Sequence, residues 1–467
     1  MNEKELSGMN GLGGMIGLEM HCYLTTKEKL FCECIASREK GLRGNVNICP
    51  ICCGMPGAKP MLPNGNAVEK AVMIALMLGC KVNLSMPWQR KHYNWPDLPK
   101  GYQNTLSGPG AIPVGEKGNF LGIGITEMHL EEDPASWNPD SGEVDYNRSG
   151  LPLVEIVTEP EFKNAEEVMG WLNELTHALA YLKAVDSNAG IKVDVNVSLQ
   201  PLPGSRSPGT QRVEIKNISS IENIGKAIYY ELERQSKEGS KRETRRYDEA
   251  KNKTILMRSK ENAEDYRFIR DPDLEDINLN NGFVAEMGNR LPEMPKVKLE
   301  KLIKKHKIDK SSAEILSKNI DIVEFFEKVI EKVEAKLAVP WVTVELMRFL
   351  NYNKKLLHEV DLKVEHFVEL LKLIEEGKIT PLKGKEILKS WHPKSSMPSV
   401  AGEGKISDEK ELMKVIEKVI SENRKAVEDY GKGEMNSFNF LLGAIMKATN
   451  KRADFAIARK LLEKRLK

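Results

Sequence analysis

The first half of the chain contains five short runs in which apolar and charged residues alternate. These runs are residues 16–21, 128–132, 151–155, 192–197 and 212–216. Side chains of a strand point alternately to two faces. In the fourth run the valines therefore form one face, and Lys192, Asp194 and Asn196 form the other. The pattern predicts a sheet with one face packed on a core and one charged face.

The charged face combines acids, a histidine, amides and bases. Glu19 shares its face with His21, and Glu214 shares its face with Arg212 and Lys216. Oxygen ligands and bases on one surface suit Mg²⁺ and a polyphosphate. For any one strand the alternative is an ordinary half-solvated antiparallel sheet. Repetition of the pattern in five strands favours a binding site.

The pattern changes along the chain from strand-like to helical. At 467 residues the chain is longer than one core usually supports. Short runs separated by turn residues predict an α+β domain, with a helix at 165–184 that backs the sheet. Beyond the Pro-containing stretch 291–295 the periodicity is helical, as at 364–377. The predicted domains are 1–292, a helical domain with a Pro/Ser/Gly-rich linker at 293–404, and a helical tail at 405–467.

Charge is balanced over the whole chain but not at its end. Lys plus Arg (70) nearly equals Asp plus Glu (68), so only a local patch could indicate nucleic-acid binding. Residues 447–467 hold eight bases and two acids, a composition that suits contact with phosphates. No apolar run is as long as a membrane span and the N-terminus does not resemble a signal peptide, so we expect a cytoplasmic protein.

Five of the seven cysteines lie between positions 32 and 53. Their two-plus-two spacing is typical of a tetrahedral, structural Zn²⁺ site. The expected ligands are Cys32, Cys34, Cys49 and Cys52, with Cys53 as the alternative to Cys52. Cys22 and Cys80 are expected to be buried apolar residues.

Phosphate binding by a glycine-rich loop is not predicted. The sequence has no Walker A motif, and the glycine-rich stretch 11–17 precedes a strand instead of joining a strand to a helix. Phosphates are therefore expected to be held by Mg²⁺ and by basic side chains. The candidates are Lys192, Lys216, Arg245, Arg246 and Arg258.

These runs, in this order, closely resemble the B subunit family of the tRNA-dependent amidotransferase GatCAB. The resemblance is carried by 16–21 (Ile-Gly-Leu-Glu-Met-His), 29–34, 49–52, 96–103, 129–133 (His-Leu-Glu-Glu-Asp), 144–148, 194–198, 213–217 and 243–248. The stretch 441–453 resembles the small tRNA-binding tail that ends the family's chains. The resemblance covers nearly the whole chain.

The resemblance implies a glutamine-synthetase-like cradle with an antiparallel sheet, followed by a helical domain and the tail. It implies that ATP and Mg²⁺ are used to phosphorylate the side-chain carboxylate of mischarged Asp-tRNA(Asn) or Glu-tRNA(Gln). Ammonia from an amidase (A) subunit then displaces phosphate, in a complex with a small C subunit. This chain has no amidase Ser-Lys signature, so a partner is expected.

Matching positions carry the family's site residues over to this chain. The implied catalytic residues are Glu19, His21, Glu131, Glu132, Glu155, Asp194 and Glu214. The implied Mg²⁺ ligands are His21, Glu131, Glu132 and Glu155. Phosphate contacts fall to Lys192, Lys216 and Arg258, and the residues expected to shape the pocket are Asp97, Lys100, Tyr102 and Arg148.

The sequence departs from the family pattern in three places, and two rival identities remain. Tyr23 stands in place of Gln, Lys192 in place of Arg, and residues 269–271 in place of Phe-Pro-Glu. Lys192 keeps the charge but loses the planar fork. One rival is the E subunit of GatDE, which carries an insertion that this chain has no room for before residue 295. The other is a non-catalytic, zinc-stabilised RNA-binding or scaffold protein, which is disfavoured because buried acids without a metal are costly.

Overall fold

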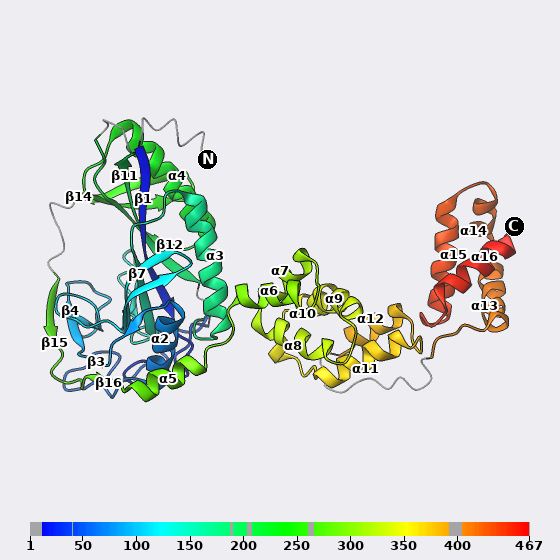
Figure 1. Ribbon diagram of the computed structural model, residues 1–467, viewed down its shortest axis with the longest axis horizontal. Helices are drawn as coiled ribbons and strands as arrows, with labels where there is room; N and C mark the ends of the chain where they lie inside the picture. Colours follow the sequence, from blue (N-terminus) through cyan, green and yellow to red (C-terminus); the bar gives the residue numbers. More distant parts are fainter. Residues whose placement is uncertain are drawn as a thin grey trace. The chain divides into compact units, whose positions relative to one another are not determined.

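The computed structural model describes residues 12–39, 41–186, 190–202, 208–259, 266–391 and 404–466, without the side chains of Arg258 and Ser259. The chain forms two compact units, Met1–Glu293 and Met294–Lys467. Figure 1 shows the described strands in the first unit and helices in the second. The α+β class is therefore confirmed. The linker expected before Gly404 lies outside the described residues, so the three-part division stays a prediction.

A twelve-stranded sheet forms the centre of the first unit. Its order is β14-β13-β12-β11-β1-β10-β7-β5-β4-β15, with β6 paired to β7 and β2 to β6. The strands are β1 (Leu12–Tyr23), β2 (Lys81–Val82), β4 (Gln89–His92), β5 (Tyr102–Thr105), β6 (Gly115–Phe120), β7 (Ile123–Glu132), β10 (Pro152–Thr158), β11 (Ile191–Pro201), β12 (Val213–Ile218), β13 (Glu243–Asp248), β14 (Lys253–Ser259) and β15 (Arg267–Arg270). Two small sheets pair β3 (Ser85–Met86) with β16 (Ile277–Asn278) and β8 (Ser136–Trp137) with β9 (Val144–Asp145).

The expectation of a purely antiparallel sheet is wrong at one pair of strands. β12 and β13 run parallel, whereas the other pairings of this sheet are antiparallel. Parallel neighbours need a crossover connection. Helix α4 (Ile221–Glu238) supplies it between the two strands.

The apolar face of the sheet is buried as the alternation predicts. Val193, Val195, Val197, Val213 and Ile215 are almost completely excluded from solvent. Helices α3 (Ala165–Tyr181) and α4 lie along this side of the sheet in Figure 1. The other helices of the unit are α2 (Gly65–Met77) and α5 (Asn281–Asn289).

The helix predicted at 165–184 is α3 (Ala165–Tyr181). It begins where the Asn164 side chain accepts a hydrogen bond from the backbone N–H of Glu167, which satisfies one free donor of the first turn. Trp171 packs edge-on against Phe120 of β6, with ring centroids 5.7 Å apart, and donates from Nε1 to the Phe120 carbonyl. The helix therefore backs the sheet as expected.

The glycine-rich stretch serves packing and does not form a phosphate loop. Its described part is the start of β1. A Cβ at Gly14 would lie 2.2 Å from the carbonyl oxygen of Lys163, and a Cβ at Gly17 would lie 3.3 Å from the Cα of Pro160. Glycine is needed here because another backbone approaches closely.

The described elements of the second unit are helices, apart from one isolated β-bridge between Ile406 and Ala453. The predicted periodic segment 364–377 is α11 (Val364–Glu375), followed by Gly377 with a φ of +68°. The other α-helices are α6 (Pro295–Lys304), α7 (Lys310–Ser317), α8 (Ile320–Ile330), α9 (Ala335–Pro340), α10 (Met347–Asn353), α12 (Pro381–Lys389), α13 (Glu409–Glu422), α14 (Arg424–Gly431), α15 (Met435–Ala448) and α16 (Phe455–Leu466). Among the described helices of either unit, none is long and apolar enough to cross a membrane.

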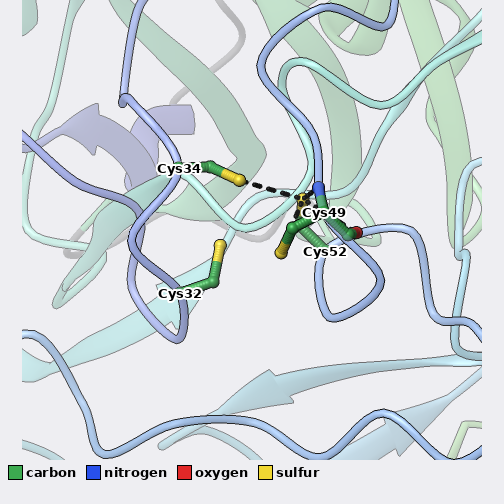
Figure 2. A group of neighbouring side chains, drawn as sticks. All are labelled: Cys32, Cys34, Cys49 and Cys52. Atoms are coloured by element: carbon green, nitrogen blue, oxygen red, sulfur yellow. Dashed lines mark hydrogen bonds between the residues drawn. The ribbon is translucent and has the colours of Figure 1, made fainter.

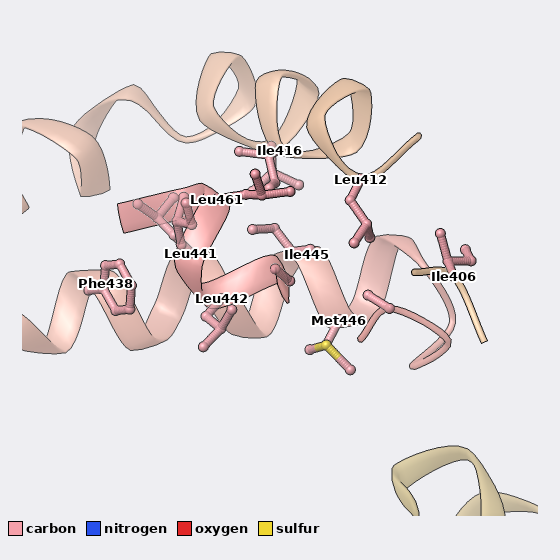
Figure 3. Packing of buried hydrophobic residues seen from close by; sticks show 13 residues of the cluster. Ile406, Leu412, Ile416, Phe438, Leu441, Leu442, Ile445, Met446 and Leu461 are labelled. Carbon is pink, nitrogen blue, oxygen red and sulfur yellow. The ribbon is translucent and has the colours of Figure 1, made fainter. Parts of the chain in front are cut away.

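Residues 406–462 build a hydrophobic core of their own. Figure 3 shows side chains of α13, α15 and α16 meeting there. Leu412, Leu441, Ile445 and Leu462 are fully buried in it.

Truncating Leu441 is expected to destabilise this core. Leu441→Ala removes buried methyl groups and leaves a cavity, so the free energy of unfolding of the segment should fall by about 3 kcal/mol. Its neighbour Phe440 is 58% exposed, and Phe440→Ala should change the same quantity by less than about 0.5 kcal/mol. Hydrogen exchange across residues 406–462 of the full chain measures both. Equal effects would show that Leu441 is not a core residue.

Candidate functional site

The five charged runs lie on neighbouring strands, so their polar faces form one surface. β12, β11, β1, β10 and β7 follow one another across the sheet. His21 pairs in register with Glu155 of β10, and Glu19 pairs with Asp194 of β11. The potential ligand atoms fall into two groups, each within 4.8 Å: one is His21, Glu131 and Glu155, and the other is Glu19, Asp194 and Glu214.

In the first group His21 stands between two carboxylates. Its Nε2 lies 3.6 Å from Oε1 of Glu131 and 3.7 Å from Oε1 of Glu155. The Thr105 hydroxyl on β5 donates to Oε2 of Glu131 at 3.1 Å, which fixes that carboxylate. One nitrogen and two carboxylates therefore face the same point.

In the second group a lysine bridges two of the three acids. Lys216 Nζ lies 2.8 Å from both Oδ2 of Asp194 and Oε1 of Glu214. The Asn196 amide donates to Oε1 of Glu19 at 2.9 Å. This group contains three carboxylates and one cation, so it remains net negative.

Hydrogen bonds from neutral groups complete the second set. The backbone N–H of Asn217 donates to Oδ1 of Asp194 at 2.7 Å. The hydroxyl of Thr244 donates to Oε2 of Glu214 at 3.0 Å. The sequence-based prediction missed Thr244 and Thr105, because it considered charged side chains and neither of these residues is charged. Only their positions on the polar faces of β13 and β5 could have indicated that they belong to the site.

Burial and mutual repulsion oppose ionisation of these acids. Burial, followed by the charge of Glu155, raises the pKa of Glu131 and also that of Glu19. Glu155 therefore couples the two groups. A divalent cation would reverse this repulsion, and the donors fit one: carboxylate oxygens are the ligands that Mg²⁺ prefers, although the nitrogen of His21 is less usual for it.

This repulsion predicts a pH dependence of stability in EDTA. A carboxyl whose pKa is raised in the folded state binds more protons there than in the unfolded state, so stability falls as pH rises. From about pH 5 to 7, the free energy of unfolding of the wild type should fall more steeply than that of Glu131→Gln. Denaturant titrations at each pH measure the two slopes. Equal slopes would contradict the assignment of a raised pKa.

The structure does not bring Glu132 into either group. It follows Glu131 directly on β7, so its side chain points to the opposite face. There it accepts hydrogen bonds from Lys100 and from the backbone N–H of Asn104. The assignment of Glu132 as a Mg²⁺ ligand is therefore corrected: it is the ion-pair partner of Lys100.

The structure also contradicts phosphate binding by Arg245. Its Nε and Nη2 donate to the hydroxyl and carbonyl of Thr254, and its Nη1 donates to Glu243 at 3.1 Å. Buried Glu231 of α4 lies 3.7 Å away. Alternation turns Arg245 toward the helix-covered side of the sheet. Arg246 is exposed at the opposite face and remains a candidate, whereas the Arg258 side chain lies outside the described residues.

A group of cations lies beside His21. Lys192 pairs in register with His21, and burial, Arg148 and then Arg38 lower its pKa, an effect that Asp133 partly offsets. Arg148 Nε lies 2.9 Å from Asp133, which also accepts from the Tyr23 hydroxyl at 2.9 Å. In the part of the chain that the structure describes, Lys192 makes no hydrogen bond from its ammonium group, so it remains a candidate for phosphate.

Two other residues of the expected pocket, Lys100 and Tyr102, lie on the Glu132 side. Lys100 and Arg90 both stand over the ring of Tyr102, 5.1 and 4.4 Å from its centroid. Oδ1 of Asp97 is buried without a hydrogen-bond donor among the described residues, and burial raises the pKa of Asp97. Asp97 lies near Arg148, the fourth residue of the predicted set: the Asp97 carbonyl accepts from the Ala135 N–H, the Ala135 carbonyl accepts from Arg148, and the charge of Arg148 lowers the pKa of Asp97 in part.

The cysteines form a separate cluster, in which four side chains converge from two loops (Figure 2). Sγ of Cys52 lies 3.9 Å from Sγ of Cys49 and 4.0 Å from Sγ of Cys34. Thiolates at about 2.3 Å from a tetrahedral zinc are about 3.8 Å apart. The cluster contains Cys32 as the fourth thiol and does not include Cys53, so the geometry favours Cys52. All seven cysteines are free, and Cys22 and Cys80 are buried as expected.

Comparison with known proteins gives the family. The model of the GatB/GatE catalytic domain matches residues 14–285, and that of the GatB domain matches residues 324–466. A Methanocaldococcus jannaschii protein, named as the B subunit of aspartyl/glutamyl-tRNA(Asn/Gln) amidotransferase, is 44% identical over 96% of this chain and 97% of that protein. Proteins of the same name from Methanobrevibacter smithii and Methanopyrus kandleri are each 40% identical, over 97% of this chain and 100% and 98% of their own lengths.

The chain therefore belongs to the family of B subunits of the tRNA-dependent amidotransferases. The GatB domain match and these relatives do not favour the E subunit. They do not favour a non-catalytic scaffold protein either.

Proposed function

We propose that this chain is the part of a multi-subunit enzyme that converts mischarged Asp-tRNA(Asn), Glu-tRNA(Gln) or both into Asn-tRNA and Gln-tRNA, using ATP. Two observations support the proposal. The first is membership of the B subunit family, and the second is the presence of two groups of potential metal-ligating side chains on five adjacent strands. The second is the observation that carries the proposal. Buried acids that repel one another destabilise a folded domain, so their presence here indicates a functional site that needs their charge.

The first step is phosphorylation of a carboxylate. A side-chain oxygen of the aminoacyl group attacks the γ-phosphorus of ATP, and the bond to the ADP oxygen breaks. Enzymes catalyse this step mainly by positioning and by neutralising charge. Mg²⁺ bound at the two groups would neutralise charge on the transferred phosphoryl group. His21, Glu131 and Glu155 would hold one ion, and Glu19, Asp194 and Glu214 the other.

Basic residues at the edges of these groups complete the phosphate site. Lys216 lies between Asp194 and Glu214, and Lys192 lies beside His21. Positive charges beside the acids would suit an anionic phosphate. These two lysines remain our candidates for the contacts with phosphoryl oxygens.

The second step forms the amide. Ammonia attacks the acyl carbon, the bond from that carbon to the phosphate oxygen breaks, and phosphate leaves. The nitrogen loses a proton in this step. Ammonia would come from an amidase A subunit, assembled with a small C subunit.

Two further roles belong to the proposal. The cysteine cluster would hold a structural zinc, because all four ligand positions are filled by protein thiols and none is left for a substrate. The tail, residues 405–467, would contact the phosphates of tRNA through its bases. The first unit would be the glutamine-synthetase-like cradle.

The test is reconstitution of the whole enzyme. This chain, with its A and C subunits, is incubated with Mg²⁺, ATP, ammonium and either mischarged tRNA, and phosphate release and the identity of the amino acid are followed. We expect amide formation that is lost in Glu19→Ala and in His21→Ala. Binding of tRNA without turnover in the wild type would instead support the non-catalytic alternative.

A further inference from the structure

Lys29 is a lysine of the first unit that is only 1% exposed and lies against the cysteine cluster. An ammonium group has three donors. Lys29 Nζ uses them on Sγ of Cys52 at 3.5 Å, on the Asn47 carbonyl at 2.9 Å and on the Tyr146 carbonyl at 3.1 Å. Every donor therefore has one acceptor.

The positive charge of Lys29 requires an anionic partner. A buried ammonium is costly unless an anion compensates it. Among the described residues no carboxylate forms an ion pair with Lys29, and two of its three acceptors are neutral carbonyls. The thiolate of Cys52 is the remaining anion. Four thiolates around one zinc ion carry a net charge of −2, which one ammonium lowers to −1.

The same hydrogen bonds join two loops. Asn47 lies in the cysteine loop, and Tyr146 lies in the loop that carries Arg148. Two more contacts strengthen the junction: the Ser149 hydroxyl donates to the Cys52 carbonyl at 2.8 Å, and the Asn47 N–H donates to Oδ1 of Asn147 at 2.8 Å. The loop at 145–150 then reaches the polar face of the sheet through the contact of Arg148 with Asp133.

We propose that Lys29 is a positioning residue of the metal site: its ammonium group holds the Cys52 thiolate in place and ties the cysteine loop to the loop at 145–150. The inference rests on the proposed zinc site. It goes further by giving a role to a residue that contributes no ligand atom. Groups that donate hydrogen bonds to metal ligands typically change metal affinity 10- to 100-fold.

The test compares Lys29→Met with Lys27→Met in the assembled enzyme. Lys27 is exposed in the same segment, which makes it a matched control. Zinc content is measured by mass spectrometry, and zinc affinity by competition with a chromogenic chelator. We expect stoichiometric zinc in the wild type, wild-type affinity in Lys27→Met, and an affinity lowered by about 10- to 100-fold in Lys29→Met.

A spectroscopic readout separates this role from general destabilisation. In the cobalt-substituted enzyme, loss of a donor to sulfur raises the energy of the thiolate electrons. The sulfur-to-cobalt charge-transfer band should therefore move to longer wavelength in Lys29→Met and stay in place in Lys27→Met. Zinc affinity and band position equal to wild type would overturn the inference and leave the zinc site intact. A wild type without zinc would overturn the zinc site and the inference with it.

A second route applies if Lys29→Met does not fold. Lys29→Gln keeps a donor without the charge, and it should again bind zinc more weakly. In the wild type, zinc removal should speed hydrogen exchange at residues 145–150, because the junction joins them to the cysteine loop. Unchanged exchange there would contradict the coupling.

Discussion

Replacing Glu155 with glutamine is expected to lower the rate of amide formation by about 10²- to 10³-fold, the usual cost of losing one preorganised electrostatic group. Glu155 lies 3.7 Å from His21, and its charge raises the pKa of acids in both groups. The variant should therefore weaken both candidate cation sites. Initial rates with saturating ATP and mischarged tRNA measure the effect.

The same substitution should have the opposite effect on stability. Without divalent cations, Glu155→Gln removes a negative charge that repels Glu19 and Glu131, so the free energy of unfolding should rise by roughly 1 kcal/mol. Glu174→Gln on the exposed side of α3 is the matched control, and it should leave both quantities unchanged. A slow and also less stable Glu155→Gln would indicate a structural role for this residue.

Removing the carboxylate of Asp271 should have the largest effect on stability. Its side chain is completely buried, and Arg90 donates to it from Nε at 2.8 Å and from Nη2 at 3.2 Å. Asn104 and the Asp273 N–H also donate to it. Breaking a buried pair leaves an uncompensated charge, so Asp271→Ala should lower the free energy of unfolding by about 3–5 kcal/mol.

A half-buried aspartate of the same loop region gives the comparison. Asp276 receives hydrogen bonds from Arg270 at the surface, and Asp276→Ala should cost no more than about 1 kcal/mol. Denaturant unfolding of the full chain, followed by a probe in the first unit, measures both. A cost below about 1 kcal/mol for Asp271→Ala would show that Arg90 is satisfied by Asp273 alone.

Alternation along strands predicted most of the site, because a strand fixes the face of each residue independently of its partners. It placed Glu19 with His21 and Asp194 with Asn196, and the register of β1 with β10 and β11 then brought these residues together. The assignment of Glu132 was wrong because it gave all the acids of the 129–133 motif the same role. Adjacent strand residues cannot share a face.

Contacts from outside a strand could not be predicted in this way. Arg245 is bound by Glu243 and Thr254 and lies near Glu231 of α4, and nothing in its own run indicates that helix. The parallel pairing of β12 and β13 likewise depends on the path of α4. The spacing of the cysteines favoured Cys52 but left Cys53 as an alternative ligand. The structure places Cys52, and not Cys53, with the other three thiols.

The most direct test of the central claim follows oxygen from the substrate carboxylate. The assembled enzyme is given mischarged tRNA whose side-chain carboxylate carries ¹⁸O at both positions, with unlabelled ATP and ammonia. If the carboxylate attacks the γ-phosphorus, each released phosphate contains one ¹⁸O and each amide retains the other. Amide formed with unlabelled phosphate would contradict phosphorylation of the carboxylate and, with it, the role assigned to the two acidic groups.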